Sequence, residues 1–222
     1  MLNVAAVIAA YLVGSVSFPY WIAHRAGVDL RHAGSRKLGG SNLYRTVGPV
    51  AGVTGGALDA AKGFGAVLLA GALGLPREVQ LACGVAAVAG QMWPAFHSFD
   101  GGRANATGWG FALGADPAAA LAMSAPLLAG LGLRQLVRPR PSRVLPLAAL
   151  ASFAVWPTLV LARGGLSADA AAGMAVLALI LLRRLTAGLR DDLRMDASLG
   201  RVLLNRALFD RSELQERGQV AI

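Results

Sequence analysis

Residues 90–107 read GQMWPAFHSFDGGRANAT, a polar, glycine-rich stretch that separates two strongly apolar segments of the chain. The paired Gly101 and Gly102 let backbone amides approach an anion without a Cβ in the way. Arg103 adds a forked guanidinium that suits a phosphate group. A polar loop of this kind between apolar segments predicts an anion site at the edge of a membrane, where a phosphorylated molecule can meet a lipid.

The composition is typical of a polytopic membrane protein. Of the 222 residues, 55% are hydrophobic, 15% are charged and 28 are glycine, and these proportions are those of a chain rich in membrane helices. The single Cys83 lies in an apolar run and excludes an intrachain disulfide framework. The net charge of +9 is concentrated in the connections between apolar runs, which argues against nucleic-acid binding.

Seven apolar runs along the chain predict seven membrane-crossing helices. They cover residues 2–24, 48–75, 79–97, 106–115, 117–133, 144–162 and 169–182. Most are close to the roughly 20 residues that cross a bilayer, and the fourth and the last are shorter. The fourth and fifth runs are separated at Asp116-Pro117, because this dipeptide favours a helix boundary.

The charges of the connections predict the orientation. Residues 25–45 carry five cationic side chains and residues 134–143 carry four arginines, so both segments are expected on the cytoplasmic side. The connections at 76–78, 116–117 and 163–169 are nearly neutral and are expected outside. We therefore expect an all-α polytopic membrane protein with seven transmembrane segments, one of them short, an external N-terminus and a cytoplasmic C-terminus.

The chain divides into a transmembrane domain over residues 1–183 and a cytoplasmic tail over residues 184–222. Apolar residues in the tail, at 202–204, Leu208 and Leu214, recur at a helical spacing. They predict an amphipathic helix on the membrane surface or against the body of the protein. A solvated tail is the alternative, because acidic residues are almost as frequent there as basic ones.

A second polar segment covers residues 34–45, which read GSRKLGGSNLYR. The segment combines glycines, hydroxyls, an amide and cations, a set that can wrap an anion. Ser35 could be positioned against a phosphoryl group, and Asn42 and Arg45 could hold the oxygens of another. The alternative interpretation is an ordinary basic loop that obeys the topology rule.

The third polar feature is the pair Asp59 and Lys62 inside an apolar run. Their separation of three residues places them on one face of a helix. Ionisable residues at membrane depth are candidates for function, but an ion pair that satisfies itself and supports a site from behind is the simpler interpretation. The expected topology brings all three polar features to the cytoplasmic side.

These motifs resemble those of the bacterial acyl-phosphate-dependent glycerol-3-phosphate acyltransferases, which are small seven-span membrane enzymes. The family's first-loop pattern, GSGNxGATN, corresponds to GSRKLGGSN at residues 34–42, and its LDxxKG pattern is fully matched by LDAAKG at 58–63. Its third pattern, GHxxP followed by FKGGKGVAT, corresponds to GQMWP at 90–94 and FDGGRANAT at 99–107. The resemblance extends over nearly the whole apolar region and implies the same fold.

The chain also departs from the family pattern. Arg36-Lys37 replaces Gly-Asn, Gln91 replaces a histidine, Asp100 replaces a lysine, and RRLTA at 183–187 lacks the family's His and Asn. Besides an acyltransferase, the alternatives are a degenerate paralogue that binds lipid or acyl phosphate or regulates a partner, and a small transporter. The sequence shows no internal repeat of the kind many transporters have.

The resemblance implies transfer of an acyl group from acyl phosphate to glycerol 3-phosphate, or to another phosphorylated polyol, in phospholipid biosynthesis. It implies a multi-pass protein of the bacterial inner (plasma) membrane, in contact with membrane lipids and using no metal or other cofactor. The residues assigned in this way are Ser35, Arg45 and Arg103 as catalytic groups, Gly34, Gly39, Asn42, Gly101, Gly102 and Thr107 as substrate-binding groups, and Asp59 and Lys62 as their support.

Overall fold

The computed structural model describes residues 1–137, 143–194 and 198–212, and the regular structure within these ranges is helical. The long helices are α1 (Leu2–Ser15), α4 (Pro49–Ala72), α5 (Arg77–Met92), α6 (Asn105–Ala115), α7 (Pro117–Leu136), α8 (Val144–Gly164), α9 (Ala168–Thr186) and α11 (Leu199–Phe209). The shorter ones are α2 (Phe18–Arg25), α3 (Gly40–Thr46), the 3-10 turn η1 (Ala95–His97) and α10 (Leu189–Leu193).

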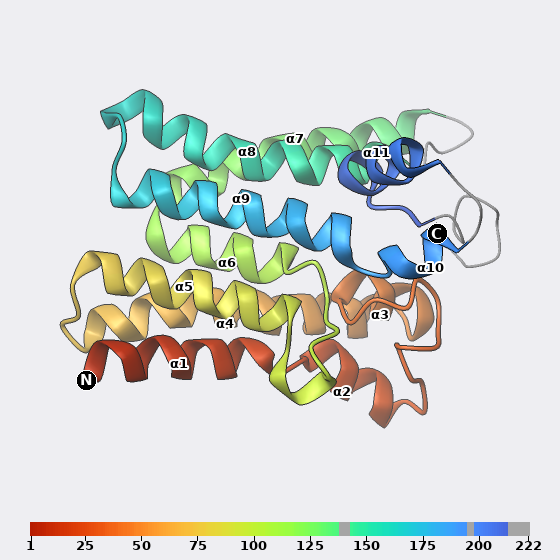
Figure 1. Cartoon of the computed structure of the whole chain (residues 1–222), viewed down its shortest axis with the longest axis horizontal. Helices are drawn as coiled ribbons and strands as arrows, with labels where there is room; N and C mark the ends of the chain where they lie inside the picture. The colour runs from red at the N-terminus through yellow and green to blue at the C-terminus, as the bar shows by residue number, and fades with distance from the viewer. Residues whose placement is uncertain (138–142, 195–197, 213–222) are drawn as a thin grey trace.

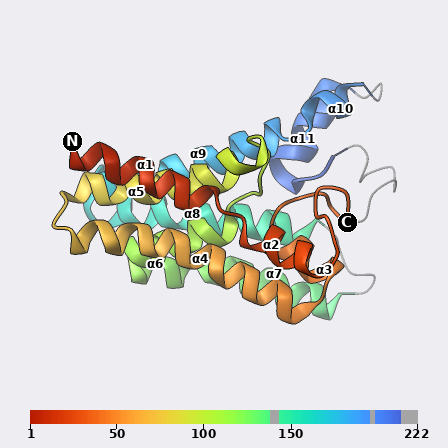
Figure 2. The same ribbon diagram turned by 90° about the horizontal axis from the view of Figure 1, so that it is seen from below.

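The helices that correspond to the seven apolar runs lie side by side and alternate in direction along the chain (Figure 1). As a result, the segments 26–48 and 93–104 and the chain after α9 lie at the same end of the bundle. The N-terminus lies at the other end, as Figure 2 also shows. Residues 138–142 of the predicted basic loop, and Leu214 of the tail, lie outside the described residues.

Within the described residues, five helical segments are long and apolar enough to cross a membrane, at Leu2–Arg25, Pro49–Ala72, Arg77–His97, Pro117–Leu136 and Val144–Gly164. The other two members of the bundle differ from them in kind. Helix α6 has 11 residues, and α9 carries Asp169 at its start and Arg183 and Arg184 at its end.

The predicted break between α6 and α7 is confirmed at Asp116. Its carboxylate accepts a hydrogen bond from the Ala119 amide at 2.9 Å, which satisfies one of the free N–H groups at the start of α7. Pro117 occupies the first turn of α7, where a missing N–H costs nothing. Arg163 of α8 pairs with the same Asp116 carboxylate at 3.0 Å.

The first apolar run forms two helices rather than one. Pro19 lies at the start of α2 and the Ser17 hydroxyl caps this helix by accepting from the Tyr20 amide. Proline ends a preceding helix because it lacks an N–H and clashes with the carbonyl four residues before it. The interruption leaves the Gly14 and Val16 carbonyls at the end of α1 without helical donors, and a side chain of α4 binds them, as described below.

Close backbone contacts hold the bundle together. A Cβ at Gly63 of α4 would collide with the Thr107 carbonyl of α6, and a Cβ at Gly90 of α5 would collide with the Tyr11 carbonyl of α1. Small residues at helix contacts are what membrane bundles require, because lipid provides no hydrophobic drive for association. Between α6 and α8, Phe111 packs edge-on against Trp156 with ring centroids 4.9 Å apart.

Cysteine labelling tests the orientation of the bundle. In a Cys83→Ser background, we expect Ser41→Cys to react with an impermeant maleimide only from the cytoplasmic side and Leu166→Cys only from the outside. Both positions are exposed and lie at opposite ends of the bundle. Leu166 is chosen for labelling rather than the adjacent Ser167, because the Ser167 hydroxyl caps α9. Labelling of both variants from the same side would contradict the alternating arrangement.

Candidate functional site

The side chain of Asn42 organises the loop that precedes α3. Its Oδ1 accepts from the Ser35 amide at 2.9 Å, and its Nδ2 donates to the carbonyls of Ala33 at 3.0 Å and Lys37 at 3.1 Å. Gly34 fits beside it because the backbone there has a φ of 56° and a Cβ would collide with the Asn42 oxygen. Asn42 is therefore committed to the loop, whereas the Ser35 hydroxyl has no hydrogen-bond partner among the described residues.

The ion pair expected within α4 is present and buried. Lys62 Nζ lies 3.0 Å from Asp59 Oδ1, and the two side chains are only 3% and 4% exposed. The same ammonium donates to the Val16 carbonyl at 2.5 Å and to the Gly14 carbonyl at 3.1 Å. Lys62 thus binds the carbonyls that the interruption between α1 and α2 leaves free.

Gln91, at the end of α5, connects this ion pair to the loop before α3. Its Nε2 donates to Asp59 Oδ2 at 3.1 Å and to the Leu38 carbonyl at 3.4 Å, and its Oε1 accepts from Lys62. The sequence marks Gln91 only as a departure from a family histidine. The structure shows it as a bridge between two of the predicted polar features.

Gly101 and Gly102 bring the loop before α6 against the end of α5 and the loop before α3. Their amides donate to the carbonyls of Met92 at 3.2 Å and Gln91 at 3.1 Å. A Cβ at Gly101 would collide with the Gln91 carbonyl, and one at Gly102 would lie 2.7 Å from the Leu38 carbonyl. Because both amides are already bonded, direct contact of these glycines with a substrate stays a prediction.

Arg183 of α9 fixes the same loop from the other side. Its guanidinium donates to the Gly101 carbonyl at 2.9 Å and to the Gly102 carbonyl at 3.4 Å, and it pairs with the Asp100 carboxylate. Arg183 is 6% exposed and Asp100 is 82% exposed, so the pair reaches from the interior to the rim of the site. No local sequence pattern predicts this pairing, because it joins residues 83 positions apart.

Two cations from different loops converge on a single carboxylate, that of Asp210. Arg103 Nε donates to Asp210 Oδ1 and Lys37 Nζ donates to Asp210 Oδ2, both at 2.6 Å. The side chains are 12%, 25% and 14% exposed for Arg103, Lys37 and Asp210. Burial lowers the pKa of Lys37 to about 8, although the Asp210 carboxylate favours its charged form. Lys37 and Asp210 were not among the predicted site residues.

Three other predicted residues lie outside this network. Arg45 is exposed on α3 and has no hydrogen bond or ion pair to the described part of the chain. Thr107 is buried between α4 and α6, and its hydroxyl has no partner within the described ranges. Gly39 precedes α3 and has open space where a Cβ would stand.

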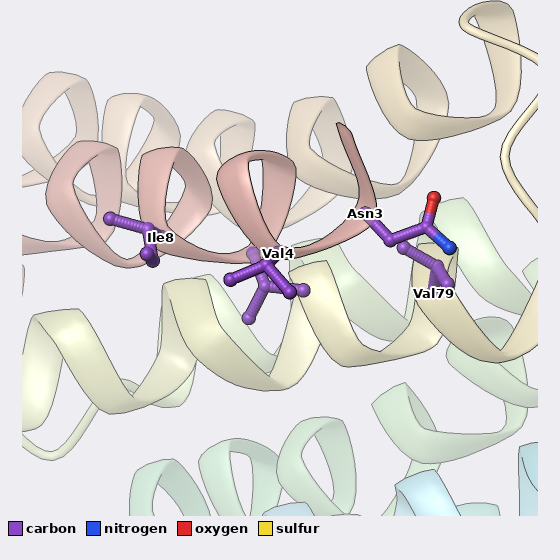
Figure 3. Close-up of a pocket in the computed structure, with 5 residues that line it drawn as sticks. Asn3, Val4, Ile8 and Val79 are labelled. Atoms are coloured by element: carbon purple, nitrogen blue, oxygen red, sulfur yellow. The ribbon is translucent and has the colours of Figure 1, made fainter. Parts of the chain in front are cut away.

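Two apolar hollows accompany the polar site. A groove of about 410 Å³ runs between α1 and α4, is lined by Val13, Phe18, Leu58 and other apolar residues, and reaches Lys62. A smaller hollow of about 250 Å³, shown in Figure 3, is lined by Asn3, Val4, Val7, Ile8 and Val79. It lies at the start of α1, away from the polar loops. No group of three His, Cys, Asp or Glu that could hold a metal occurs in the ranges described.

Comparison with known proteins gives the family. The family model described as glycerol-3-phosphate acyltransferase matches residues 4–193. The chain belongs to this family. A glycerol-3-phosphate acyltransferase of a Synechococcus species is 36% identical over 177 residues, covering 78% of this chain and 83% of the relative. The resemblance inferred from the loop motifs is thereby confirmed.

A solved structure extends the likeness to the fold. One such structure is the crystal structure of PlsY (YgiH), an integral membrane glycerol 3-phosphate acyltransferase, in its glycerol 3-phosphate form. Its sequence is 30% identical to this chain, the TM-score is 0.73, and the match covers 98% of each chain. Glycerol-3-phosphate acyltransferase 5 of Dehalococcoides mccartyi is 42% identical over 115 residues. This match spans about half of each protein, 51% of this chain and 49% of the relative. The all-helical, multi-pass membrane fold is shared.

The buried ion pair gives a stability prediction. We expect Lys62→Met to lower the free energy of unfolding by about 3–5 kcal/mol, because it leaves the Asp59 carboxylate buried without its cation. The double variant Asp59→Asn with Lys62→Met should recover part of this loss. Thermal unfolding in detergent of the two single variants and of the double variant is the measurement. If the double variant is as unstable as the sum of the two single variants, the two side chains are not coupled.

The loop glycines give a second prediction. Gly101→Ala should lower stability by about 1–3 kcal/mol, because the added methyl group has no room against the Gln91 carbonyl. Gly39→Ala is the matched control, since the space beside it is open. Thermal unfolding of both variants is the measurement, and equal effects would show that the packing of the loop before α6 is not what requires a glycine.

Proposed function

We propose that the protein transfers an acyl group from acyl phosphate to the 1-hydroxyl of glycerol 3-phosphate and so forms lysophosphatidic acid and phosphate. The observation that carries the proposal is the convergence of Arg103 and Lys37, from two separate loops, on one anionic group. Both substrates are phosphorylated, and paired cations of this kind hold phosphate oxygens well. Membership of the glycerol-3-phosphate acyltransferase family supports acyl transfer to glycerol 3-phosphate, and acyl phosphate as the donor is part of the proposal.

The chemistry makes modest demands on the protein. The hydroxyl oxygen of glycerol 3-phosphate attacks the acyl carbon, the bond from this carbon to the phosphate oxygen breaks, and the hydroxyl proton passes to the departing phosphate. Phosphate is a good leaving group, so stabilisation of the negative charge on the tetrahedral intermediate is the main requirement. In this proposal Arg103 and Lys37 bind the phosphate group. The free hydroxyl of Ser35 donates a hydrogen bond to the reacting oxygens.

The apolar groove between α1 and α4 is a suitable place for the acyl chain. It is lined mostly by alanine, valine and leucine side chains, and Lys62 is part of its lining. From Lys62 the hydrogen bonds of Gln91 lead to the loop that contains Lys37 and Ser35. An acyl chain in this groove would place its phosphate end toward the polar loops.

The proposed topology has seven spans, an external N-terminus and a cytoplasmic site in the bacterial inner membrane. Helix α6 is about 17 Å long at 1.5 Å per residue, shorter than the roughly 30 Å hydrocarbon layer. The short helix is consistent with a loop that lies inside the bundle. Gly101 and Gly102, which precede α6, contact Gln91, and Gln91 lies beside the middle of α4. The recess would bring the phosphate groups close to the lipid boundary.

The alternative is a paralogue that binds acyl phosphate without turnover. The observation that favours it is the replacement of family polar residues, with Gln91 in place of a histidine and Asp100 in place of a lysine. An assay of the purified protein separates the two hypotheses.

Turnover in nanodiscs supplied with acyl phosphate and glycerol 3-phosphate tests the proposal. We expect Arg103→Ala to lower the rate by about 10²–10³, the usual effect of removing one donor to a developing charge. Arg163→Ala, at the opposite end of the bundle beside Asp116, is the matched control and should leave the rate unchanged. Ser35→Ala should lower the rate, whereas Ser41→Ala should not.

The product identifies the reaction. Lysophosphatidic acid and inorganic phosphate should appear in equal amounts. Absence of product with glycerol 3-phosphate and with other phosphorylated polyols, while acyl phosphate still binds in an Arg103-dependent manner, would overturn the enzyme assignment in favour of the binding protein.

A further inference from the structure

Asp210 lies beyond the residues that the family model matches, although the match to the solved PlsY structure covers 98% of the chain. The family-model match ends at residue 193, and α11 with Asp210 follows it. Nevertheless, the Asp210 carboxylate lies on Arg103 and Lys37, which are the cations of the proposed phosphate site. The C-terminal tail therefore contributes a charged group to the centre of the site.

Specific contacts hold α11 against the body of the protein. Arg206 donates to the buried Asp192 carboxylate at 2.6 Å and to the Gly188 carbonyl at 2.8 Å. Val202 is 1% exposed, and Figures 1 and 2 show α11 beside the ends of α8 and α9. The predicted helix in the tail is thus present and packs on the protein. These contacts anchor most of α11 independently of Asp210.

The end of α11 is directed at the site. Arg184, the last basic residue of α9, donates to the carbonyls of Ala207 at 3.1 Å and Leu208 at 3.3 Å, at the negative end of the helix dipole. Asp210 has a left-handed backbone with a φ of 49°, which aspartate tolerates better than most residues. Its amide donates to the Arg206 carbonyl at 3.1 Å, and the chain turns there.

We propose that Asp210 is an internal competitor for the phosphate group of the substrate, so that an anionic substrate binds to Arg103 and Lys37 only when the Asp210 carboxylate leaves them. Each carboxylate oxygen accepts from a different cation, as two oxygens of one phosphate would. Lys37 also donates to the Asp210 backbone carbonyl at 3.0 Å. The inference rests on the proposed function, because that function assigns phosphate to these cations.

A role for Asp210 as the general base fits the geometry less well. Both of its oxygens are already occupied by cations, which makes the carboxylate a poor proton acceptor. Burial alone would raise the pKa of Asp210, but Arg103, Lys37 and Arg184 outweigh burial and hold it well below its usual range. The carboxylate is therefore suited to neutralising the site rather than to taking a proton.

Competition has a measurable consequence for affinity. The apparent dissociation constant equals the intrinsic constant divided by the fraction of protein in which the site is free. Removal of the carboxylate should therefore strengthen binding of anions, in contrast to removal of a residue that positions the cations.

Binding of inorganic phosphate and of glycerol 3-phosphate to the full-length protein is the first test. We expect Asp210→Asn to bind both about ten-fold more tightly than the wild type, and Arg103→Ala combined with Asp210→Asn to lose the gain. Asp191→Asn is the control, because Asp191 is an exposed acid of the tail. Unchanged or weaker binding by Asp210→Asn would overturn the proposal.

The binding experiment and the turnover assay distinguish failure of the competitor proposal from failure of the acyltransferase assignment. If no lysophosphatidic acid forms but Asp210→Asn still binds phosphate more tightly, the competitor holds and the acyltransferase assignment fails. If turnover occurs, Asp210→Asn should lower KM for glycerol 3-phosphate with little change in kcat. A fall in kcat at constant KM would instead show a positioning role and refute competition.

Hydrogen exchange of the wild type provides a test that needs no variant. The amides of Asp210 and Arg211 donate to the Arg206 and Asn205 carbonyls at the end of α11. Saturating glycerol 3-phosphate should accelerate exchange of these two amides, whereas the amides near Val202 should be unaffected. Unchanged or slower exchange at Asp210 and Arg211 would refute displacement, even if Asp210→Asn did not fold.

Discussion

The ammonium group of Lys62 is the point on which the rest of the structure depends. It lies inside the bundle, where a charge is tolerated only if other groups compensate it. Asp59 on the same helix, two carbonyls from the interrupted end of α1 and Gln91 of α5 provide this compensation. A single cation thus joins three helices, and it binds the carbonyls that the interruption before Pro19 leaves free.

The same interaction sets the geometry of the site at a distance. Gln91 donates to the Leu38 carbonyl and its own carbonyl accepts from the Gly102 amide. Lys37 directly precedes Leu38 in the chain, and Arg103 directly follows Gly102. These are the two cations of the site. The buried ion pair therefore supports both cations through the backbone. This arrangement preorganises the cations, which is the main contribution a protein makes to a reaction of this kind.

Features encoded by local spacing could be predicted from the sequence, and those that depend on distant partners could not. The apolar runs, the helix boundary at Asp116 and the pairing of Asp59 with Lys62 depend on periodicity or on a three-residue separation. The pairing of Arg103 with Asp210 joins residues 107 positions apart, and no local pattern indicates it. Gly101 and Gly102 illustrate a further limit: their role as anion ligands stays a prediction, and the sequence does not indicate the packing role that their bonded amides and missing side chains have in the structure.

The departures from the family motifs form a connected set in the structure. Asp100, which replaces a lysine of the family pattern, pairs across the site with Arg183 of α9. Arg184 stands where the family has a histidine, and it binds the last turn of α11. That helix delivers Asp210 to Arg103 and Lys37. Because several of the replaced groups have specific partners, the substitutions are better explained as a rearranged site than as the decay of an old one.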